Sequence, residues 1–373
     1  MEKKVLLFAC KWNKVKERTW SGTSYALNKA LAKQFRIEDF NIVDYKALKI
    51  LRKIKKKLFK NFSNELENDI IKINQIRYYL AYANQRKIIF QFMECPYNQK
   101  TVNYIYQDLC VEYIKHLHDK NPDIYKISEF QMTSEKYLEK RIDSQRKYYQ
   151  HCKGIFTMSI WLADYLVRDL GYNSKKIHSV GGGINVDSNK IDYSLKSGNK
   201  ILFIGRNFER KAGPFVCKAF EYLRNNIDCN AELYILGPSE RPKETEKDGI
   251  IFVGEASANE VSKYFNLCDI FCMPSYFEAY GLVFAEALCY GLPCIGRNAY
   301  AMGEFITEGV NGHLISEDNI EELAKKMEDL LCDSNIRDYV RTHKMQYTEM
   351  YSWDSVANKI ANIINKDGFD INI

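Results

Sequence analysis

Ser275-Tyr-Phe-Glu-Ala-Tyr-Gly-Leu-Val-Phe-Ala-Glu-Ala-Leu-Cys-Tyr-Gly-Leu-Pro293 carries the most informative local pattern in the chain. It follows Asp269-Ile-Phe-Cys-Met-Pro274, an apolar run typical of a short buried strand, which ends at a proline. Gly281 then begins an apolar run whose members recur at helical spacing. The pattern predicts a strand, a loop that carries Glu278, and a helix that carries Glu286.

The start of this predicted helix suits an anion. Its first N–H groups have no partner within the helix and lie at the positive end of the peptide dipole, which favours the diphosphate of a nucleotide. The candidate donors are the amides of Tyr280, Gly281 and Leu282. Glu278 and Glu286 could accept hydrogen bonds from a sugar and a ribose on either side of that phosphate. The alternative is that Glu278 only caps the helix dipole and Glu286 is a solvated surface acid.

A second candidate for anion binding follows another predicted strand, Lys200-Ile-Leu-Phe-Ile-Gly205. In the next stretch, Arg206-Asn-Phe-Glu-Arg-Lys-Ala-Gly213, Arg206 and Lys211 stand five residues apart directly after the strand. Two cations placed in this way can close on a diphosphate. The alternative is a basic turn on the protein surface.

Composition limits the class of protein. With 373 residues the chain exceeds the usual size of a single hydrophobic core, so we expect two domains. The formal net charge of +6 is modest, and basic residues concentrate near residues 46–60, which favours a local anionic partner over nucleic acid. The 11 cysteines include no C-x-x-C pair, which favours reduced thiols in the cytoplasm over a disulfide scaffold or a zinc site. No apolar run approaches the roughly 18 residues that span a bilayer.

The basic segment Tyr45–Lys60 is amphipathic at helical spacing. Its apolar residues fall on or near one stripe, and lysines with Arg52 fill the remaining positions. Such a helix can lie on an anionic membrane surface, where each basic residue contributes about 1 kcal/mol. The alternative is a solvated helix whose stripe packs on its own domain.

The N-terminal part of the chain has the pattern of a doubly wound fold. Val5–Cys10 is a continuous apolar run, as expected for a strand covered on both faces by helices. A loop ending in Trp20–Ser24 and a helical run follow it, which is the strand, loop and helix of a first βα unit. Lys87–Met93 and Val102–Tyr106 predict two further strands.

Taken together, these stretches resemble a known family. Glu278 and Glu286 reproduce the E-x(7)-E motif of retaining GT-B glycosyltransferases, and the surrounding residues look like the pattern of family four, E-x-F/Y-G-L…E-A…G-x-P. The stretch Arg206–Gly213 looks like the family's G-R-x-x-x-x-K-G loop, with Ala212 where glycine is commoner. Residues 154–187 resemble the signature at the end of the family's N-terminal domain, and residues 353–364 its final helix.

The resemblance implies an α/β chain with the GT-B fold, in which two Rossmann-like domains face each other across a cleft. Residues 1–187 would form an acceptor-binding domain, joined by the C-terminal helix 353–366. Residues 188–199 would be a linker, and residues 200–352 would form the domain that binds the donor. The expected location is the cytoplasm, with contact to the inner face of the cell membrane.

The resemblance also implies an activity. A sugar would move from a nucleoside diphosphate sugar, with a UDP-sugar favoured, to a hydroxyl of a glycan or lipid-linked acceptor with its configuration retained. The nucleotide sugar is a substrate, so no separate cofactor is expected. The sequence contains no Asp-x-Asp triplet, which favours a reaction without a metal ion.

The resemblance also implies roles for individual residues of this sequence. The resemblance points to Glu278, Arg206, Lys211 and Asp108 as catalytic candidates; Asp108 follows a predicted strand where relatives place a histidine or an acid. The donor-binding candidates are Glu286, Tyr280, Gly281, Leu282, Gly205, Gly22, Phe252 and Val253. Relatives often have two glycines in the first loop, whereas only Gly22 is present here, so an ordinary turn is an alternative at that position.

Two other functions fit the same sequence. One is a GT-B epimerase or phosphorylase, of which the epimerase would convert a nucleotide sugar without any acceptor. A non-catalytic accessory protein on a membrane surface would bind liposomes through residues 46–60 without binding a nucleotide.

Overall fold

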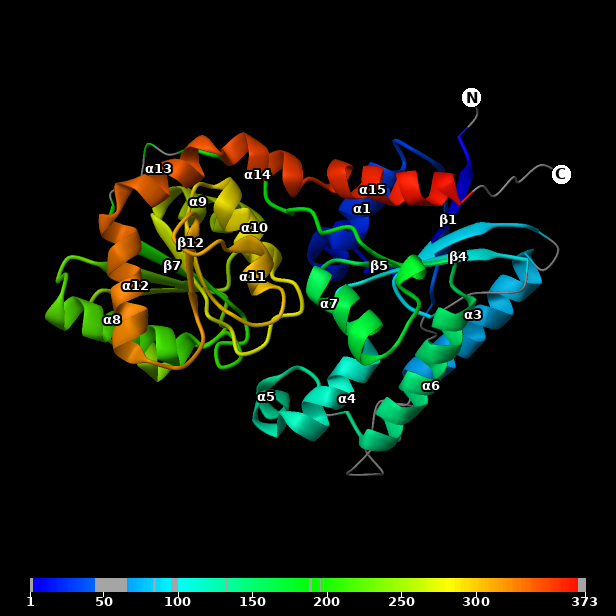
Figure 1. Cartoon of the computed structure of the whole chain (residues 1–373), viewed down its shortest axis with the longest axis horizontal. Coiled ribbons are helices and arrows are strands. Elements are labelled where there is room, and N and C mark those ends of the chain that lie inside the picture. Colours follow the sequence, from blue (N-terminus) through cyan, green and yellow to red (C-terminus); the bar gives the residue numbers. More distant parts are fainter. Residues whose placement is uncertain are drawn as a thin grey trace. The chain divides into compact units, whose positions relative to one another are not determined.

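The computed structural model describes residues 3–43, 66–82, 85–94, 100–131, 133–187, 190–192, 194, 196 and 198–367. The chain divides into two compact units, each with its own sheet (Figure 1). The first unit comprises Met1–Gly182 and Trp353–Ile373, and the second comprises Gly183–Ser352.

The first unit is built on a six-stranded parallel sheet with the strand order β2-β1-β3-β4-β5-β6. The strands are β1 (Val5–Cys10), β2 (Arg36–Asn41), β3 (Ile88–Gln91), β4 (Val102–Gln107), β5 (Gly154–Thr157) and β6 (Ile177–Ser179). The central strands are buried along almost their whole length, because helices cover both faces of a parallel sheet. The edge strand β2 is mostly exposed.

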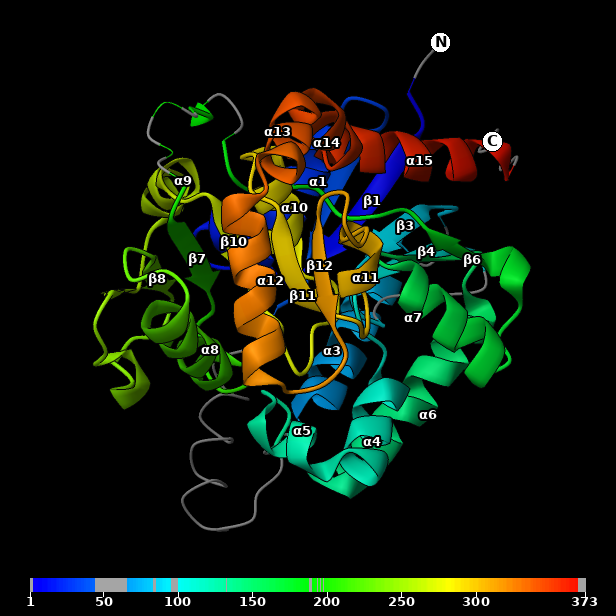
Figure 2. The ribbon, with the colours of Figure 1, turned by 60° about the vertical axis from the view of Figure 1, so that its left-hand side comes forward.

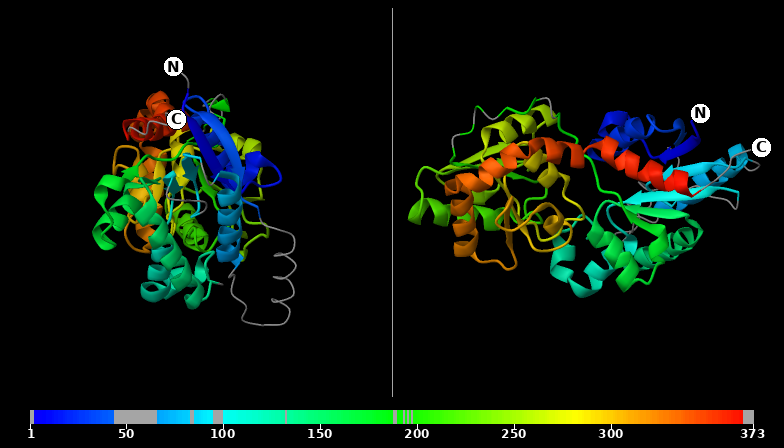
Figure 3. Two further views of the ribbon diagram at one scale, coloured as in Figure 1. Left: turned by 90° about the vertical axis from the view of Figure 1, so that its right-hand side faces the viewer. Right: turned by 45° about the horizontal axis from the view of Figure 1, so that its top comes forward.

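The helices of the first unit include the C-terminal helix. Those described are η1 (Lys16–Gly22), α1 (Thr23–Leu31), α3 (Leu66–Tyr82), α4 (Val111–Lys120), α5 (Pro122–Ile127), α6 (Glu135–His151), α7 (Ile160–Asp164), η2 (Tyr165–Asp169), η3 (Ser174–Lys176) and α15 (Trp353–Lys366). Helix α15 packs beside α1 (Figure 3). Lys33 pairs with Asp354 at 2.6 Å, and Gln34 donates to Asn358 at 2.7 Å, so polar contacts also join α15 to the end of α1.

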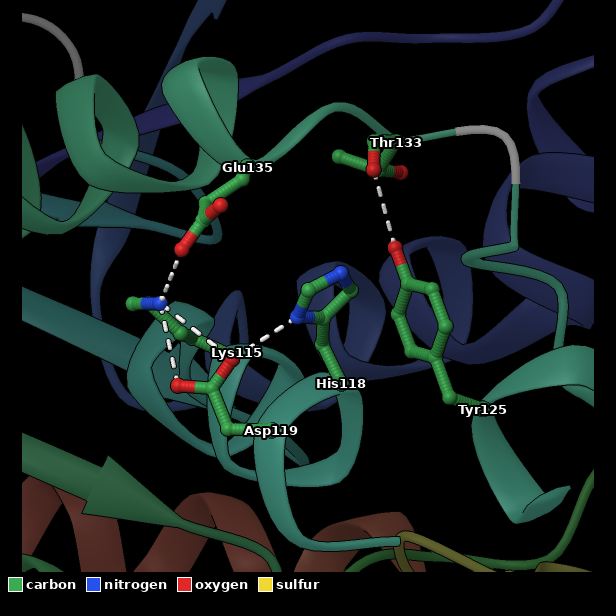
Figure 4. Close-up of polar contacts among 6 residues, drawn as sticks. All are labelled: Lys115, His118, Asp119, Tyr125, Thr133 and Glu135. Atoms are coloured by element: carbon green, nitrogen blue, oxygen red, sulfur yellow. Dashed lines mark hydrogen bonds and ion pairs between the residues drawn. The ribbon is translucent and has the colours of Figure 1, made fainter. Parts of the chain in front are cut away.

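Polar contacts join α4 to the start of α6, and α5 to the segment before α6 (Figure 4). Lys115 of α4 lies 3.0 Å from Asp119, one turn further along, and 3.0 Å from Glu135 at the start of α6. The His118 ring nitrogen Nδ1 lies 2.7 Å from the same Asp119 carboxylate. Because these ion pairs are partly exposed to water, they contribute little to the stability of the fold.

The second unit repeats the architecture with a six-stranded parallel sheet in the order β12-β11-β10-β7-β8-β9. Its strands are β7 (Lys200–Ile204), β8 (Glu232–Leu236), β9 (Ile250–Gly254), β10 (Ile270–Cys272), β11 (Cys294–Arg297) and β12 (Gly312–Ile315). Its helices are α8 (Gly213–Asn226), α9 (Ala258–Leu267), α10 (Leu282–Cys289), α11 (Met302–Phe305), α12 (Ile320–Cys332), α13 (Ser334–Thr342) and α14 (Lys344–Met350). Figure 2 shows α8 and α12, which pack side by side.

The predicted α/β fold class is confirmed, since each unit is a parallel sheet with helices around it. The described part of residues 188–199 lies in the second unit and contacts α9: the Asp192 amide donates to Asn266 at 2.9 Å, and the Lys196 ammonium donates to the Phe265 carbonyl at 2.9 Å. The predicted basic helix at residues 46–60 lies outside the described residues. Within the described part of the chain, no helix has the length and apolar character needed to cross a membrane.

Candidate functional site

The carboxyl ends of β10, β7 and β8 form one edge of the second sheet, because these strands are neighbours and parallel. Strands β7 and β10 are followed by loops that lead into α8 and α10, so the two loops meet at this edge. In an open α/β sheet the loops after the strands are where ligands bind. Lys211 comes from the first loop and Glu278 from the second.

Glu278 lies among cations. Its Oε2 atom accepts a hydrogen bond from the Lys211 ammonium and lies 3.6 Å from the Arg210 guanidinium. All three side chains are largely shielded, with exposures of 12% for Lys211 and 13% each for Arg210 and Glu278. Arg210 also donates to the Phe277 carbonyl at 2.5 Å, and its own carbonyl accepts from the Tyr276 amide at 3.0 Å. The two loops are therefore joined at the glutamate.

Gly205 makes room for Lys211. A Cβ atom at Gly205 would stand 2.7 Å from Cγ of Lys211, so any larger residue there would displace the lysine stem. On its other side, a Cβ at Gly237, after β8, would stand 2.6 Å from the carbonyl carbon of Gly205, and Gly237 has a φ of +116°. Close backbone packing at the ends of β7 and β8 therefore sets the position of Lys211.

Helix α10 begins where the sequence predicts. Gly281 is its N-cap, with φ 95° and ψ 52°, a left-handed conformation that glycine adopts without strain. The Tyr280 side chain is buried against Phe305, with 4.9 Å between the ring centroids. Leu282 is the first residue of the helix and is half-buried.

A further cluster holds the loop that carries Glu278. Arg297, at the end of β11, contacts Asp318 at 2.6 Å and stacks over the Tyr276 ring at 4.7 Å. The Tyr276 hydroxyl donates to the same Asp318 carboxylate at 2.6 Å, and Arg297 donates to the Pro274 carbonyl at 3.3 Å. The loop is thus fixed from the side of β11 as well as from that of β7.

Glu286 is the most electrostatically unusual acid of the motif. It is half-buried on α10, and burial raises the pKa of its carboxyl group to about 7 from an ordinary 4.5. Its Oε1 atom accepts a hydrogen bond from the Asn185 amide at 3.1 Å, which partly offsets that rise in pKa. This environment differs from that of a solvated surface acid, and an uncharged or hydrogen-bonded state suits Glu286 best.

Glu286→Gln is expected to raise the free energy of unfolding relative to the parent, and to raise it more at pH 8 than at pH 5. Between pH 4.5 and 7 the folded protein keeps a proton on Glu286 that the unfolded chain has lost, so the parent's free energy of unfolding falls as pH rises through this window. Glutamine keeps the hydrogen bond from Asn185 without ionising. The difference between variant and parent should grow by about 1–3 kcal/mol across the window, measured by urea unfolding at both pH values.

Glu349→Gln is the control, because this acid is exposed on α14 and should give no such change. A difference for Glu286→Gln that stays the same at pH 5 and pH 8 would contradict the account of Glu286.

The remaining donor-side residues take different positions. Arg206 is exposed directly after Gly205, whereas Arg210, the cation between the two predicted ones, lies at Glu278. The sequence pattern favours Arg206 and leaves Arg210 as a spare cation, because both arginines satisfy the same charge pattern. Phe252 and Val253 belong to β9 itself and are half-buried, so the loop after β9 begins only at Glu255.

The first unit contains a cavity of about 350 Å³ at the carboxyl ends of its central strands. Trp20, Phe92 and Tyr106 form an aromatic wall, with centroid distances of 5.6 Å from Trp20 to Phe92 and 6.0 Å from Phe92 to Tyr106. Asp108 lines the cavity and is half-buried one residue after the end of β4, as the sequence predicts. Lys11 also lines it. The cavity has the size and mixed lining of a small-molecule site.

Backbone strain borders this cavity. Trp20 and Ser21 adopt left-handed conformations with φ of 47° and 56°, and Gly22 follows with φ 99° as the N-cap of α1. A left-handed conformation costs a non-glycine residue about 1–2 kcal/mol. Such strain is typical of ligand sites. Gly22 lies next to this strained pair, and Trp20 itself lines the cavity.

Among the residues that the structure describes, no group of three or more His, Cys, Asp or Glu side chains is arranged to hold a metal ion.

Comparisons with known proteins point to the glycosyltransferases. Residues 187–346 match the family model of glycosyl transferases group 1. An uncharacterized glycosyltransferase of Methanocaldococcus jannaschii is 25% identical over 237 residues, covering 58% of this chain and 60% of the relative. Across this and two further curated relatives, the chain spans between 30% and 60% of their length.

Solved structures match nearly the whole chain. WaaG, a glycosyltransferase involved in lipopolysaccharide biosynthesis, aligns with a TM-score of 0.65 at 16% identity, covering 96% of this chain and 99% of WaaG. Anabaena HepE, solved in complex with UDP and glucose, aligns with a TM-score of 0.63 at 12% identity, covering 98% of this chain and 100% of HepE. At these identities the likeness concerns the fold. Residues 187–346 thus match the family of glycosyl transferases group 1, and the chain as a whole has the GT-B fold seen in solved glycosyltransferases.

Proposed function

We propose that the protein is a retaining glycosyltransferase that moves a sugar from a nucleoside diphosphate sugar to a hydroxyl group of a glycan or lipid-linked acceptor. The observation that carries the proposal is the meeting of Lys211 and Arg210 with Glu278 beside the start of α10, within the matched group 1 domain. Cations next to a helix N-terminus suit a diphosphate, and an adjacent carboxylate suits sugar hydroxyls.

In this proposal the leaving diphosphate is stabilised by charges of the chain itself. Lys211, Arg210 and the exposed Arg206 supply the cations, and the first amides of α10 supply further donors. Fixed positive groups at the position where charge develops lower the barrier most effectively. The sequence contains no Asp-x-Asp triplet, which supports a reaction in which these cations, and not a metal ion, stabilise the charge of the leaving diphosphate.

Glu278 has the role of orienting the transferred sugar. Lys211 and Arg210 hold its carboxylate in place, so that the carboxylate can accept hydrogen bonds from hydroxyl groups of the sugar. The leaving phosphate takes the proton of the acceptor hydroxyl on the same face of the sugar, which retains its configuration without a covalent intermediate. Glu286 accepts hydrogen bonds from the ribose on the other side of the diphosphate, where Asn185 already orients it.

The acceptor belongs to the first unit in this proposal. The cavity lined by Trp20, Tyr106 and Asp108 offers aromatic faces for the apolar side of a sugar ring and a carboxylate for its hydroxyls. Asp108 positions the acceptor hydroxyl there. The second unit binds the donor, and UDP is the favoured nucleotide.

Nucleotide binding is the direct test. UDP is expected to raise the unfolding temperature of the protein more than GDP or ADP do, because a ligand that binds only the folded state stabilises it in proportion to its affinity. Transfer is then measured with radiolabelled UDP-sugars and lipid or oligosaccharide extracts. Labelled product that appears only with an acceptor supports the proposal.

Two results would replace this function with another. Conversion of the nucleotide sugar to its epimer in the absence of any acceptor would indicate an epimerase. The absence of any shift with all three nucleotides and their sugars would indicate a protein that has kept the fold without the activity.

A further inference from the structure

Helix α6 contributes to an ion pair that is buried in the first unit. Glu94, three residues after the end of β3, is 1% exposed, and its Oε2 atom accepts a hydrogen bond from the Arg141 guanidinium at 2.8 Å. Arg141 is 6% exposed. A buried ion pair is weak evidence for stability, because apolar side chains in place of both partners often give a fold that is equally or more stable. Its presence here indicates a role in placing the segments that it joins.

Gln145 extends this pair to a second loop. Its Nε2 atom donates to Oε1 of Glu94 at 2.5 Å, and its Oε1 atom accepts from the amide of Val111, the first residue of α4, at 2.8 Å. The Gln145 side chain is 2% exposed. Glu94 belongs to the loop after β3, and Val111 ends the loop between β4 and α4. One buried glutamine amide therefore joins the two loops.

Tyr149 makes a contact of the same kind. Its hydroxyl donates to Oε1 of Gln107, the last residue of β4, and its side chain is 2% exposed. Arg141, Gln145 and Tyr149 follow one another at intervals of four residues, so they lie along one face of α6. This buried face thus holds the ends of both β3 and β4 through polar contacts.

The same two loops line the cavity of the first unit. Phe92 and Met93 come directly before Glu94, and Gln107 and Asp108 lie at and just after the end of β4. The described lining comes from residues 9–24, 42, 92–93 and 106–109. Helix α6 therefore acts on the cavity through the loops that it holds.

We infer that Glu94 and Gln145 are positioning residues for the acceptor; this inference rests on the proposed function, in which the cavity takes the acceptor. The bridge from Glu94 through Gln145 to the Val111 amide sets how far Phe92 stands from Asp108. These two residues supply an aromatic face and a carboxylate to a sugar ring. Hydrogen bonds have narrow limits of length and direction, so a buried polar bridge holds two loops more tightly than apolar packing alone.

Gln145→Met tests the bridge, because methionine has a side chain of similar length that cannot join Glu94 to the Val111 amide. Glu94 keeps its pair with Arg141, so no buried charge loses its partner. The amount of acceptor extract that gives half-maximal transfer is expected to rise about five- to twentyfold, less than the roughly hundredfold that a displacement of about 1 Å can cost. The half-saturating UDP-sugar concentration and the thermal shift produced by UDP should stay those of the parent.

Gln150→Met is the matched control. Gln150 is exposed on the same helix, so the same substitution leaves the bridge intact and should leave both half-saturating amounts unchanged. Tyr149→Phe is a second variant, which removes only the hydroxyl that donates to Gln107. It should raise the half-saturating amount of acceptor extract by about two- to fivefold, the effect of one lost hydrogen bond. If Gln145→Met does not fold, Tyr149→Phe decides alone.

The outcomes separate this inference from the proposed function. If the parent transfers sugar and the folded variants need no more acceptor extract than the parent, the inference is wrong and the function stands. An equal rise in the half-saturating amounts of donor and acceptor would also overturn it, because the bridge would then support the fold in general. A parent that transfers no sugar to any extract refutes the proposed function, and this inference with it.

Discussion

Lys211→Ala is expected to lower the rate of sugar transfer by roughly a factor of 10² to 10³, the range found when one fixed donor to a developing negative charge is removed. Lys211 is the cation that donates directly to Glu278, so its loss affects both the diphosphate and the orientation of the sugar. The fold should survive, because Arg210 remains 3.6 Å from Glu278 and the carboxylate is not left without a cation. Initial rates at saturating donor measure the loss of transfer, and the unfolding temperature measures whether the fold survives.

Lys218→Ala provides the control for Lys211→Ala. Lys218 lies on α8, the helix that follows the same loop, and its side chain is exposed, so the same substitution changes the net charge equally without touching Glu278. It should transfer sugar at the parent rate. Near-normal turnover in Lys211→Ala, in a protein that binds the donor, would refute the role of the lysine in the reaction.

Gly281→Ala is expected to reduce both stability and transfer. The left-handed φ of 95° costs an alanine about 1–2 kcal/mol. In addition, the new Cβ would stand 3.1 Å from Cγ of Glu278 and 3.0 Å from the Phe284 ring, so these side chains must shift by a few tenths of an ångström. A displacement of about 1 Å can cost roughly a hundredfold in rate, so this smaller shift should still slow transfer several-fold. Urea unfolding and initial rates should therefore both change.

Gly309→Ala separates these two causes. Gly309 has a φ of +72° in the same unit, but a Cβ there would meet nothing within 4 Å. It should lose a similar amount of stability through backbone strain alone and keep its transfer rate. If Gly281→Ala and Gly309→Ala have equal transfer rates, the close approach of Gly281 to Glu278 has no role in the site.

Much of the fold could be predicted because its strands are short, apolar and flanked by turn residues. The strand predicted at Val5–Cys10 is β1 to the residue, and Ser159 caps α7 through its side chain, as its position before an apolar run suggests. Edge strand β2 was missed because Arg36–Asn41 is half polar, as a strand with a solvated side can be. Strand β11 was missed since it has only four residues and begins directly after a glycine and a proline.

The candidate site was predicted less completely than the fold. Glu278 and Glu286 were found from their spacing around a helix start, which is a local property of the chain. The order of the strands β10-β7-β8 is not local, and it alone brings Lys211 to a glutamate 67 residues away. Which arginine joins them also depends on the turn that follows β7: Asn207 bonds the Arg210 amide at 3.1 Å, and Arg210 reaches the other loop while Arg206 stays exposed.

By itself, the sequence determined the two-sheet α/β class, the helix start at Gly281 and the residue types that can hold a diphosphate, because each depends on neighbours within a few turns of chain. Only the tertiary structure decided that Arg210 joins Lys211 at Glu278, that burial raises the pKa of Glu286 to about 7, and that α6 brings Arg141 and Gln145 to Glu94. Contact, burial and exposure depend on which distant segments cover a side chain. The spacing of residues along the chain does not predict which segments these are.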